Sequence, residues 1–177
     1  NQNNRATYEI QYGNLERPTH LSTSWDLARF EVAAQRWADL CEGDYGVALL
    51  NDCKYGYDIL GNEMRLSLLR GPEHPDPEAD LGRQVFTYAL LPHAGDFRRG
   101  GVIEEAESLN NPVTLHPVAQ QQGDLPPEQS WIRVDRPGLY ITAVKMAERE
   151  NALIVRAYEA WGTRGPAVLH TTLPITE

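Results

Sequence analysis

The sequence of 177 residues is poor in cysteine and has no long apolar run. Its two cysteines, Cys41 and Cys53, are too few for a disulfide-built fold, so free thiols in a reducing compartment are expected, with a single bridge as the alternative. No apolar stretch approaches the roughly 20 residues that a membrane helix needs. The first residues, NQNNRATYEI, have neither the basic nor the apolar region of a signal peptide and lack an initiator Met, which suggests a piece of a longer protein.

Basic charge is also scarce. The chain has 16 Lys and Arg against 25 Asp and Glu, which gives a formal net charge of −9, and it contains no basic block. Nucleic acid and anionic membranes are therefore poor candidates as partners. The hydrophobic fraction of 41% is that of an ordinary globular protein, and the length suffices for one domain or two small ones.

Common catalytic and metal-binding motifs are missing as well. The five histidines form no HExxH or HxH arrangement and the cysteines no CxxC, so no metal site made by this chain alone is expected. GxSxG, P-loop and GxGxxG patterns are absent. Glu104, Glu105 and Glu107 could be paired carboxylates, but a solvated helix face explains them better. The acids of PDPEAD could bind Ca²⁺ but lack EF-hand spacing.

Most apolar segments are short and rich in β-branched or aromatic residues, which is typical of strands. Turn signals such as GPEHPDPEAD and GTRGP separate them. This spacing predicts a mainly β chain, a β-sandwich rather than a barrel. Strands are expected in ATYEIQY, GVALLN, MRLSLLR, VFTYALLP, WIRVD, GLYITAVKMA, ALIVRAYEAW and AVLHTTL.

One connecting helix is predicted near residues 96–109, where Asp96 can cap it and NNP ends it. FEVAAQRWADLC fits a helix and a long strand equally well, because periodicity alone does not distinguish them. After the helix, the polar and proline-bearing residues 116–130 form no periodic pattern. We therefore expect a β-sandwich domain in residues 1–115, a linker in 116–130, and a small terminal β-unit in 131–177 with a hairpin turning at Glu148–Asn151.

The segment NDCKYGYD carries more chemistry than a plain hairpin turn needs. Asn51 and Asp52 offer groups that bind hydroxyls, Lys54 adds a charged donor, and Tyr55 and Tyr57 offer flat faces. A sugar needs this combination, because it combines vicinal hydroxyls with an apolar face that stacks on aromatic rings. The alternative is that Asn51 and Asp52 merely close a turn while the tyrosines pack beneath it.

Several long strings of the sequence follow the same order as in a known family: EIQYGNLERPTH, TSWDLARFEV, RWADLCEGDYGVALLNDCKYGYD, MRLSLLR, PDPEAD, FTYALLPH, LNNP and VKMAERENALIVRAYEAWG. Because of these strings, the chain resembles the C-terminal half of the glycoside hydrolase family 38 α-mannosidases. The resemblance covers nearly the whole chain. It is greatest to the bacterial and cytosolic branch, which implies a cytoplasmic location.

The resemblance implies the end of a large sandwich related to the galactose mutarotase fold, followed by a small β-unit. Family members are retaining exo-α-mannosidases whose N-terminal domain holds a divalent metal, usually zinc, an Asp nucleophile and an acid/base carboxylate. A retaining mechanism needs two carboxyl groups about 5 Å apart. Nothing in this sequence matches that part of the family pattern. No catalytic residue, metal ligand or cofactor is therefore assigned to this segment, and zinc or another divalent metal is expected in the catalytic domain.

The part of the family pattern that does match is a loop that reaches the active-site cleft. Asn51, Asp52 and Lys54 fit its form, with Lys54 where Golgi and lysosomal relatives have an Arg, and a Lys and an Arg do not bind hydroxyls alike. Tyr55 and Tyr57 would line the cleft or support the turn. Glu16 and Arg17, in ERPTH, are expected near the same cleft.

Three functional interpretations follow. The first is a non-catalytic scaffold that donates a loop to the cleft for a mannose-containing oligosaccharide, with the catalytic domain of the same chain as its partner. The second is an independent carbohydrate-binding module, in which Trp25, Trp131 and Trp161 stack on sugar rings, although core packing explains Trp131 better. The third is an assembly surface for a homo-oligomer, formed by the small β-unit.

Overall fold

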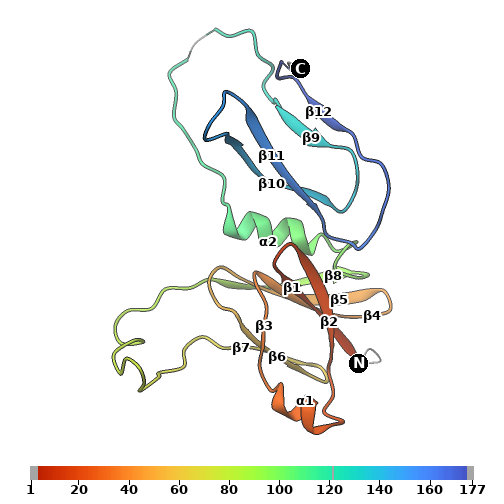
Figure 1. Ribbon diagram of the computed structural model, residues 1–177, viewed down its shortest axis with the longest axis vertical. Helices are drawn as coiled ribbons and strands as arrows, with labels where there is room; N and C mark the ends of the chain where they lie inside the picture. Colours follow the sequence, from red (N-terminus) through yellow and green to blue (C-terminus); the bar gives the residue numbers. More distant parts are fainter. Residues whose placement is uncertain (1–3, 121, 175–177) are drawn as a thin grey trace. The chain divides into compact units, whose positions relative to one another are not determined.

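The computed structural model describes residues 4–120 and 122–174, and the chain divides into two compact units, Asn1–Val113 and Thr114–Glu177 (Figure 1). Strands dominate both units and the sheets stay open, so the mainly β prediction is confirmed. The predicted linker, 116–130, lies in the second unit and contains no helix or strand in its described residues. Among the described residues, none of the helices has the length and apolar character needed to cross a bilayer.

The first unit is built on a five-stranded antiparallel sheet with the strand order β2-β1-β4-β5-β8. A second sheet of three strands, in the order β3-β6-β7, packs against one of its faces. The first sheet consists of β1 (Arg5–Ile10), β2 (Gly13–Pro18), β4 (Trp37–Glu42), β5 (Tyr45–Asn51) and β8 (Tyr88–Ala94). The second consists of β3 (Val32–Ala33), β6 (Gly56–Leu60) and β7 (Glu63–Leu66).

A hydrophobic core lies between these two sheets. Tyr8 on β1 and Tyr57 on β6 meet in an edge-to-face arrangement with their ring centroids 6.5 Å apart. Both side chains are buried, and Ala38 and Leu49 from the five-stranded sheet belong to the same cluster. The first unit is therefore a sandwich, in which alternate residues of the central strands face the second sheet.

Helix α2 (Val102–Asn110) covers the other face of the five-stranded sheet, against β4 and β5. Its buried residues are Val102, Ile103 and Ala106. Trp37 on β4 stacks on Phe97, with the ring centroids 5.1 Å apart. The central strands thus bury both faces, which explains why Trp37, Ala38 and Asp39 are all buried in succession.

The predicted helix near 96–109 is present, but it begins at Val102, so the prediction that Asp96 caps it is wrong. The Asp96 carboxylate accepts hydrogen bonds from the backbone of Arg98 and Arg99, at 3.1 and 3.2 Å, and closes a separate turn. Gly101 then takes a left-handed conformation, with φ 64°, directly before the helix. A left-handed residue cannot continue an α-helix, so the start moves past the glycine pair.

A short helix, α1 (Ser24–Ala28), was not predicted. Thr23 and Asp26 form a capping box, in which each side chain accepts from the backbone N–H of the other residue. The sequence signal for it is TSWD, with Thr23 at the N-cap and Asp26 three residues later. The ambiguous segment FEVAAQRWADLC forms strands β3 and β4.

The second unit contains two antiparallel pairs, β10–β11 and β9–β12. The predicted hairpin is confirmed: its turn is closed by a backbone hydrogen bond of 2.8 Å from Ala147 to Ala152. Tyr140 and Tyr158 pair across the strands, with their ring centroids 6.0 Å apart. The strands are β9 (Ile132–Val134), β10 (Leu139–Met146), β11 (Leu153–Glu159) and β12 (Leu169–Thr171).

Candidate functional site

The segment Asp52–Tyr55, which we call the crossing loop, joins β5 of the five-stranded sheet to β6 of the three-stranded sheet. It therefore passes from one layer of the sandwich to the other and does not close a hairpin. Both residues that flank it in the chemistry-rich segment, Asn51 and Tyr57, are buried. The loop is consequently fixed at both ends by the core.

Asn51 and Tyr57 are occupied by contacts within the first unit. The Asn51 amide donates to the Gln35 carbonyl at 3.1 Å and to the Tyr57 hydroxyl, while its oxygen accepts from the Lys54 backbone N–H. Asn51 is 1% exposed and Tyr57 is fully buried, and burial raises the pKa of the Tyr57 phenol. These are the contacts expected if Asn51 closes a turn and the tyrosine packs beneath it. Asn51 and Tyr57 hold the crossing loop in place.

Asp52 ties the start of the crossing loop to the residue before β8. Its backbone N–H donates to the Thr87 carbonyl at 3.1 Å, and its carboxylate accepts from the Thr87 N–H at 2.9 Å. The hydrogen bond from the Cys53 thiol and the Thr87 N–H lower the pKa of the Asp52 carboxyl. Asp52 is exposed, so an ionised carboxylate stands at the surface at neutral pH.

The tip of the crossing loop consists of Lys54 and Tyr55. The Lys54 ammonium lies 4.9 Å from the centroid of the Phe86 ring, a cation–π contact. Tyr55 is 57% exposed. Both line a surface groove of about 530 Å³, the loop groove, together with Glu31, Val32, Ala33, Cys53, Gly56, Ser67, Leu68, Leu69, Arg70, Pro72 and Asp80.

The charged walls of the loop groove are paired with each other or with the backbone. Arg70 forms an ion pair with Glu31. The Asp80 carboxylate accepts from the backbone N–H groups of Gly71 and Arg70, at 2.7 and 3.1 Å, which lowers its pKa. Sequence reasoning missed both residues: Arg70 lies in MRLSLLR, which was expected to continue as a strand whereas β7 ends at Leu66, and Glu31 lies in the ambiguous segment FEVAAQRWADLC.

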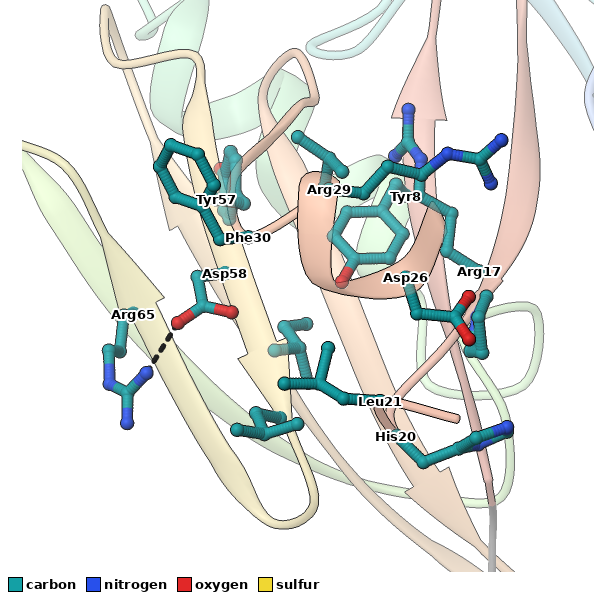
Figure 2. A pocket seen from close by; sticks show the side chains of 14 residues that line it. Tyr8, Arg17, His20, Leu21, Asp26, Arg29, Phe30, Tyr57, Asp58 and Arg65 are labelled. Atoms are coloured by element: carbon teal, nitrogen blue, oxygen red, sulfur yellow. Dashed lines mark hydrogen bonds and ion pairs between the residues drawn. The ribbon is translucent and has the colours of Figure 1, made fainter. Parts of the chain in front are cut away.

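A second recess of about 170 Å³, the arginine pocket, lies in the same unit (Figure 2). Arg17 and Tyr57 belong to it, and Val32 lines both recesses. Sequence reasoning missed its further arginines, Arg29 and Arg65. The pocket is lined by Tyr8, Arg17, Pro18, His20, Leu21, Asp26, Arg29, Phe30, Val32, Tyr57, Asp58, Ile59, Leu60 and Arg65.

The seven residues that the sequence singled out are thus not brought into one site. Lys54 and Tyr55 line the loop groove, while Arg17 and Tyr57 line the arginine pocket. Glu16 lines neither recess and forms an exposed ion pair with Arg5 at 3.6 Å. Glu16 and Arg17 are neighbours on β2, and successive side chains of a strand point to opposite faces.

The described residues contain no group of three or more His, Cys, Asp or Glu side chains that could hold a metal ion. Cys41 and Cys53 form no disulfide bond within the described part of the chain. The family resemblance assigns the divalent metal to the catalytic domain, and no chemical step is assigned to a metal in this chain.

Comparison with known proteins identifies relatives for the whole chain. Residues 1–78 match the family model "Glycosyl hydrolases family 38 C-terminal domain", and residues 138–177 match "Glycosyl hydrolases family 38 C-terminal beta sandwich domain". Alpha-mannosidase 2C1 of Mus musculus is 49% identical over 178 residues, which cover 98% of this chain and 17% of the relative. Alpha-mannosidase G of Dictyostelium discoideum is 45% identical over 158 residues, which cover 89% of this chain and 14% of the relative.

A solved structure shares the fold. The crystal structure of an alpha-mannosidase from Enterococcus faecalis V583 superimposes with a TM-score of 0.82 at 25% identity, over 98% of this chain and 21% of that chain. The present chain thus spans only about a sixth of the length of the curated relatives, 17% of the first of them. The two family matches, with relatives that extend over nearly all of the chain, show that it belongs to glycosyl hydrolase family 38 and corresponds to the C-terminal part of its members.

Proposed function

We propose that this chain is the non-catalytic C-terminal β-region of an α-mannosidase that hydrolyses terminal α-D-mannosides with retention. The observation that carries the proposal is the 49% identity to alpha-mannosidase 2C1 across 98% of the chain. The two carboxyl groups that a retaining glycosidase needs, and a divalent metal such as zinc, are assigned to the remaining part of the parent enzyme. In this proposal the chain is chiefly scaffold, and its partner is the catalytic domain of the same polypeptide.

The crossing loop is the element that we propose to contribute to the sugar-binding cleft. Its tip presents an ammonium group, Lys54, and a half-exposed ring, Tyr55, beside the ionised Asp52. These groups supply a charged donor, an acceptor and a stacking surface, which together suit the hydroxyls and the apolar face of a mannose ring. Asn51 and Tyr57 support this arrangement from the core, so that the loop is preorganised before substrate arrives.

In the parent enzyme, Lys54→Ala is expected to lower kcat/KM for an aryl α-mannoside about 10- to 100-fold, which is about 1.5–3 kcal/mol for a charged hydrogen bond. The measurement is steady-state kinetics of the full-length enzyme. Lys145→Ala is the matched control, because Lys145 is the other lysine of the chain and lies exposed on β10 of the second unit. Equal kcat/KM values for Lys54→Ala and Lys145→Ala would show that the crossing loop does not contribute to the sugar-binding cleft.

The alternative, an independent carbohydrate-binding module, is favoured by two exposed tryptophans. Trp25 is 74% exposed and Trp131 is 50% exposed, so the core-packing interpretation of Trp131 is wrong for this chain. Exposed indole rings are common stacking platforms for sugars. If the main proposal holds, titration of the chain with mannose and short α-mannosides, followed by tryptophan fluorescence and calorimetry, gives no saturation at millimolar sugar. Saturable binding would instead favour the module.

Two further properties are part of the proposal. A cytoplasmic location is inferred from the resemblance to the cytosolic branch and from the two cysteines, Cys41 and Cys53, which form no disulfide in the described residues. Assembly into a homo-oligomer is inferred from exposed apolar residues on the hairpin of the second unit, Val144, Met146 and Leu153. Fractionation of cells and the concentration dependence of the mass in solution would test them.

A further inference from the structure

The arginine pocket concentrates positive charge in a chain whose formal net charge is −9. Its two acids already have partners. Asp58 pairs with Arg65 (Figure 2), and Arg65 also pairs with Glu63. Asp26 belongs to the capping box of α1, and the Thr23 hydroxyl and the Ser22 and Thr23 N–H groups lower its pKa. The Arg65 guanidinium thus balances Asp58, whereas Asp26 keeps its negative charge in the pocket lining because its hydrogen-bond partners are neutral groups.

The remaining cations of the pocket are Arg17 and Arg29. Among residues 4–120 and 122–174, no carboxylate forms an ion pair with either guanidinium, and the buried Nη1 of Arg17 has no hydrogen-bond partner. Figure 2 shows both arginines beside the Tyr8 ring, and the Arg17 guanidinium carbon lies 4.6 Å from its centroid. Burial, and the neighbouring charge of Arg29, lower the pKa of Arg17. A guanidinium nevertheless stays protonated in proteins, so two like charges face one recess.

Apart from Asp26 and Asp58, the walls of the pocket add no negative charge. Burial raises the pKa of Tyr8 to about 12, so its phenol is neutral at physiological pH. Phe30 is 69% exposed and, with Tyr57, gives the pocket an aromatic side.

We propose that the arginine pocket binds the carboxylate or phosphate group of a small anion between Arg17 and Arg29. A guanidinium presents a planar fork of donors that matches the two oxygens of such a group. A volume of about 170 Å³ accommodates the anionic group, and the exposed ring of Phe30 can contact the carbon part of a ligand. The site is separate from the crossing loop and does not depend on the proposed sugar binding.

The anionic group has two potential sources. It can belong to a free small molecule, or it can be the carboxylate of an Asp or Glu side chain in the part of the parent enzyme outside this chain. An anionic group from either source would accept hydrogen bonds from the same two arginines, Arg17 and Arg29. The experiment therefore compares the 177-residue chain with the full-length parent, using inorganic phosphate and acetate as probes.

Calorimetric titration of the chain at constant ionic strength, with chloride as the reference anion, is expected to give saturable millimolar binding of at least one probe. Arg29→Gln should weaken it at least about tenfold, since it removes a charge-assisted hydrogen bond at an exposed position. Arg17→Gln should do the same. Arg83→Gln, the matched control outside the pocket, should bind like the unaltered chain.

If the parent binds the probe as the chain does, the pocket serves a free small molecule. If the chain binds and the parent does not, a carboxylate of the parent fills the pocket. Absence of saturable binding to the chain, or an equal loss in Arg29→Gln and Arg83→Gln, would overturn the proposal. None of these outcomes depends on mannosidase activity, so they are distinguishable from a failure of the proposed function.

Discussion

Trp37→Ala is expected to lower the free energy of unfolding of the first unit by about 3–5 kcal/mol. The Trp37 side chain is 1% exposed and stacks on Phe97 at 5.1 Å between the five-stranded sheet and helix α2. Alanine leaves a cavity there, because strand β4 and the segment before α2 can move together only partly. The stacking of Trp37 on Phe97 is therefore lost.

Urea denaturation followed by far-UV circular dichroism measures this effect without relying on tryptophan emission. Trp25→Ala is the matched control, because Trp25 is 74% exposed on α1, and its replacement is expected to change stability by no more than about 0.5 kcal/mol. Comparable losses in the two variants would show that Trp37 does not anchor α2.

Arg36→Met is expected to destabilise the same unit by about 2–4 kcal/mol, since a buried carboxylate loses its cation. Glu9 is 3% exposed on β1, and its carboxylate accepts from Arg36 Nε at 3.1 Å and Nη2 at 2.5 Å. Arg36 also contacts Glu107 of helix α2, and its hydrogen bond to Glu9 raises its pKa. The guanidinium thus links the edge of the sandwich to the helix.

Arg65→Met provides the control for this second effect, because Arg65 pairs with Asp58 and Glu63 while half of its side chain stays in solvent. Exposed pairs contribute about 0–1 kcal/mol. The double variant Glu9→Gln/Arg36→Met should recover part of the loss, because it removes the unpaired buried charge. An Arg36→Met effect no larger than that of Arg65→Met would mean that water reaches the Glu9 carboxylate.

How much of the fold can be predicted from sequence depends on how each strand is covered. β8 shows alternating exposure along Tyr88–Ala94, and its apolar run was recognised as a strand. Trp37, Ala38 and Asp39 are all buried, because a sheet covers one face of β4 and a helix covers the other. These residues therefore lack the alternation of buried and exposed positions that identifies a strand. The segment FEVAAQRWADLC stayed ambiguous for that reason.

The candidate sites show a different limit of prediction from sequence. The composition of the crossing loop is visible in the sequence, but the burial of Asn51 and Tyr57 is a property of the two sheets that close over them. The pairing of Arg17 with Arg29 across one pocket likewise depends on where α1 is positioned, and no local pattern encodes it. Chemistry-bearing residues can be recognised one by one, whereas their partners come from tertiary structure.

The crossing loop is well suited to directed diversification. Its ends are fixed by the buried Asn51 and Tyr57, and a Cβ at Gly56 would lie 2.0 Å from a Glu31 carboxylate oxygen, so that a larger residue there would displace the Glu31 side chain. Cys53 and Tyr55 are exposed, and Lys54 projects beside them into the loop groove. A combinatorial library at Cys53, Lys54 and Tyr55 can therefore change the ligand preference of the groove while the sandwich keeps its register, which makes this β-region a scaffold for engineered recognition.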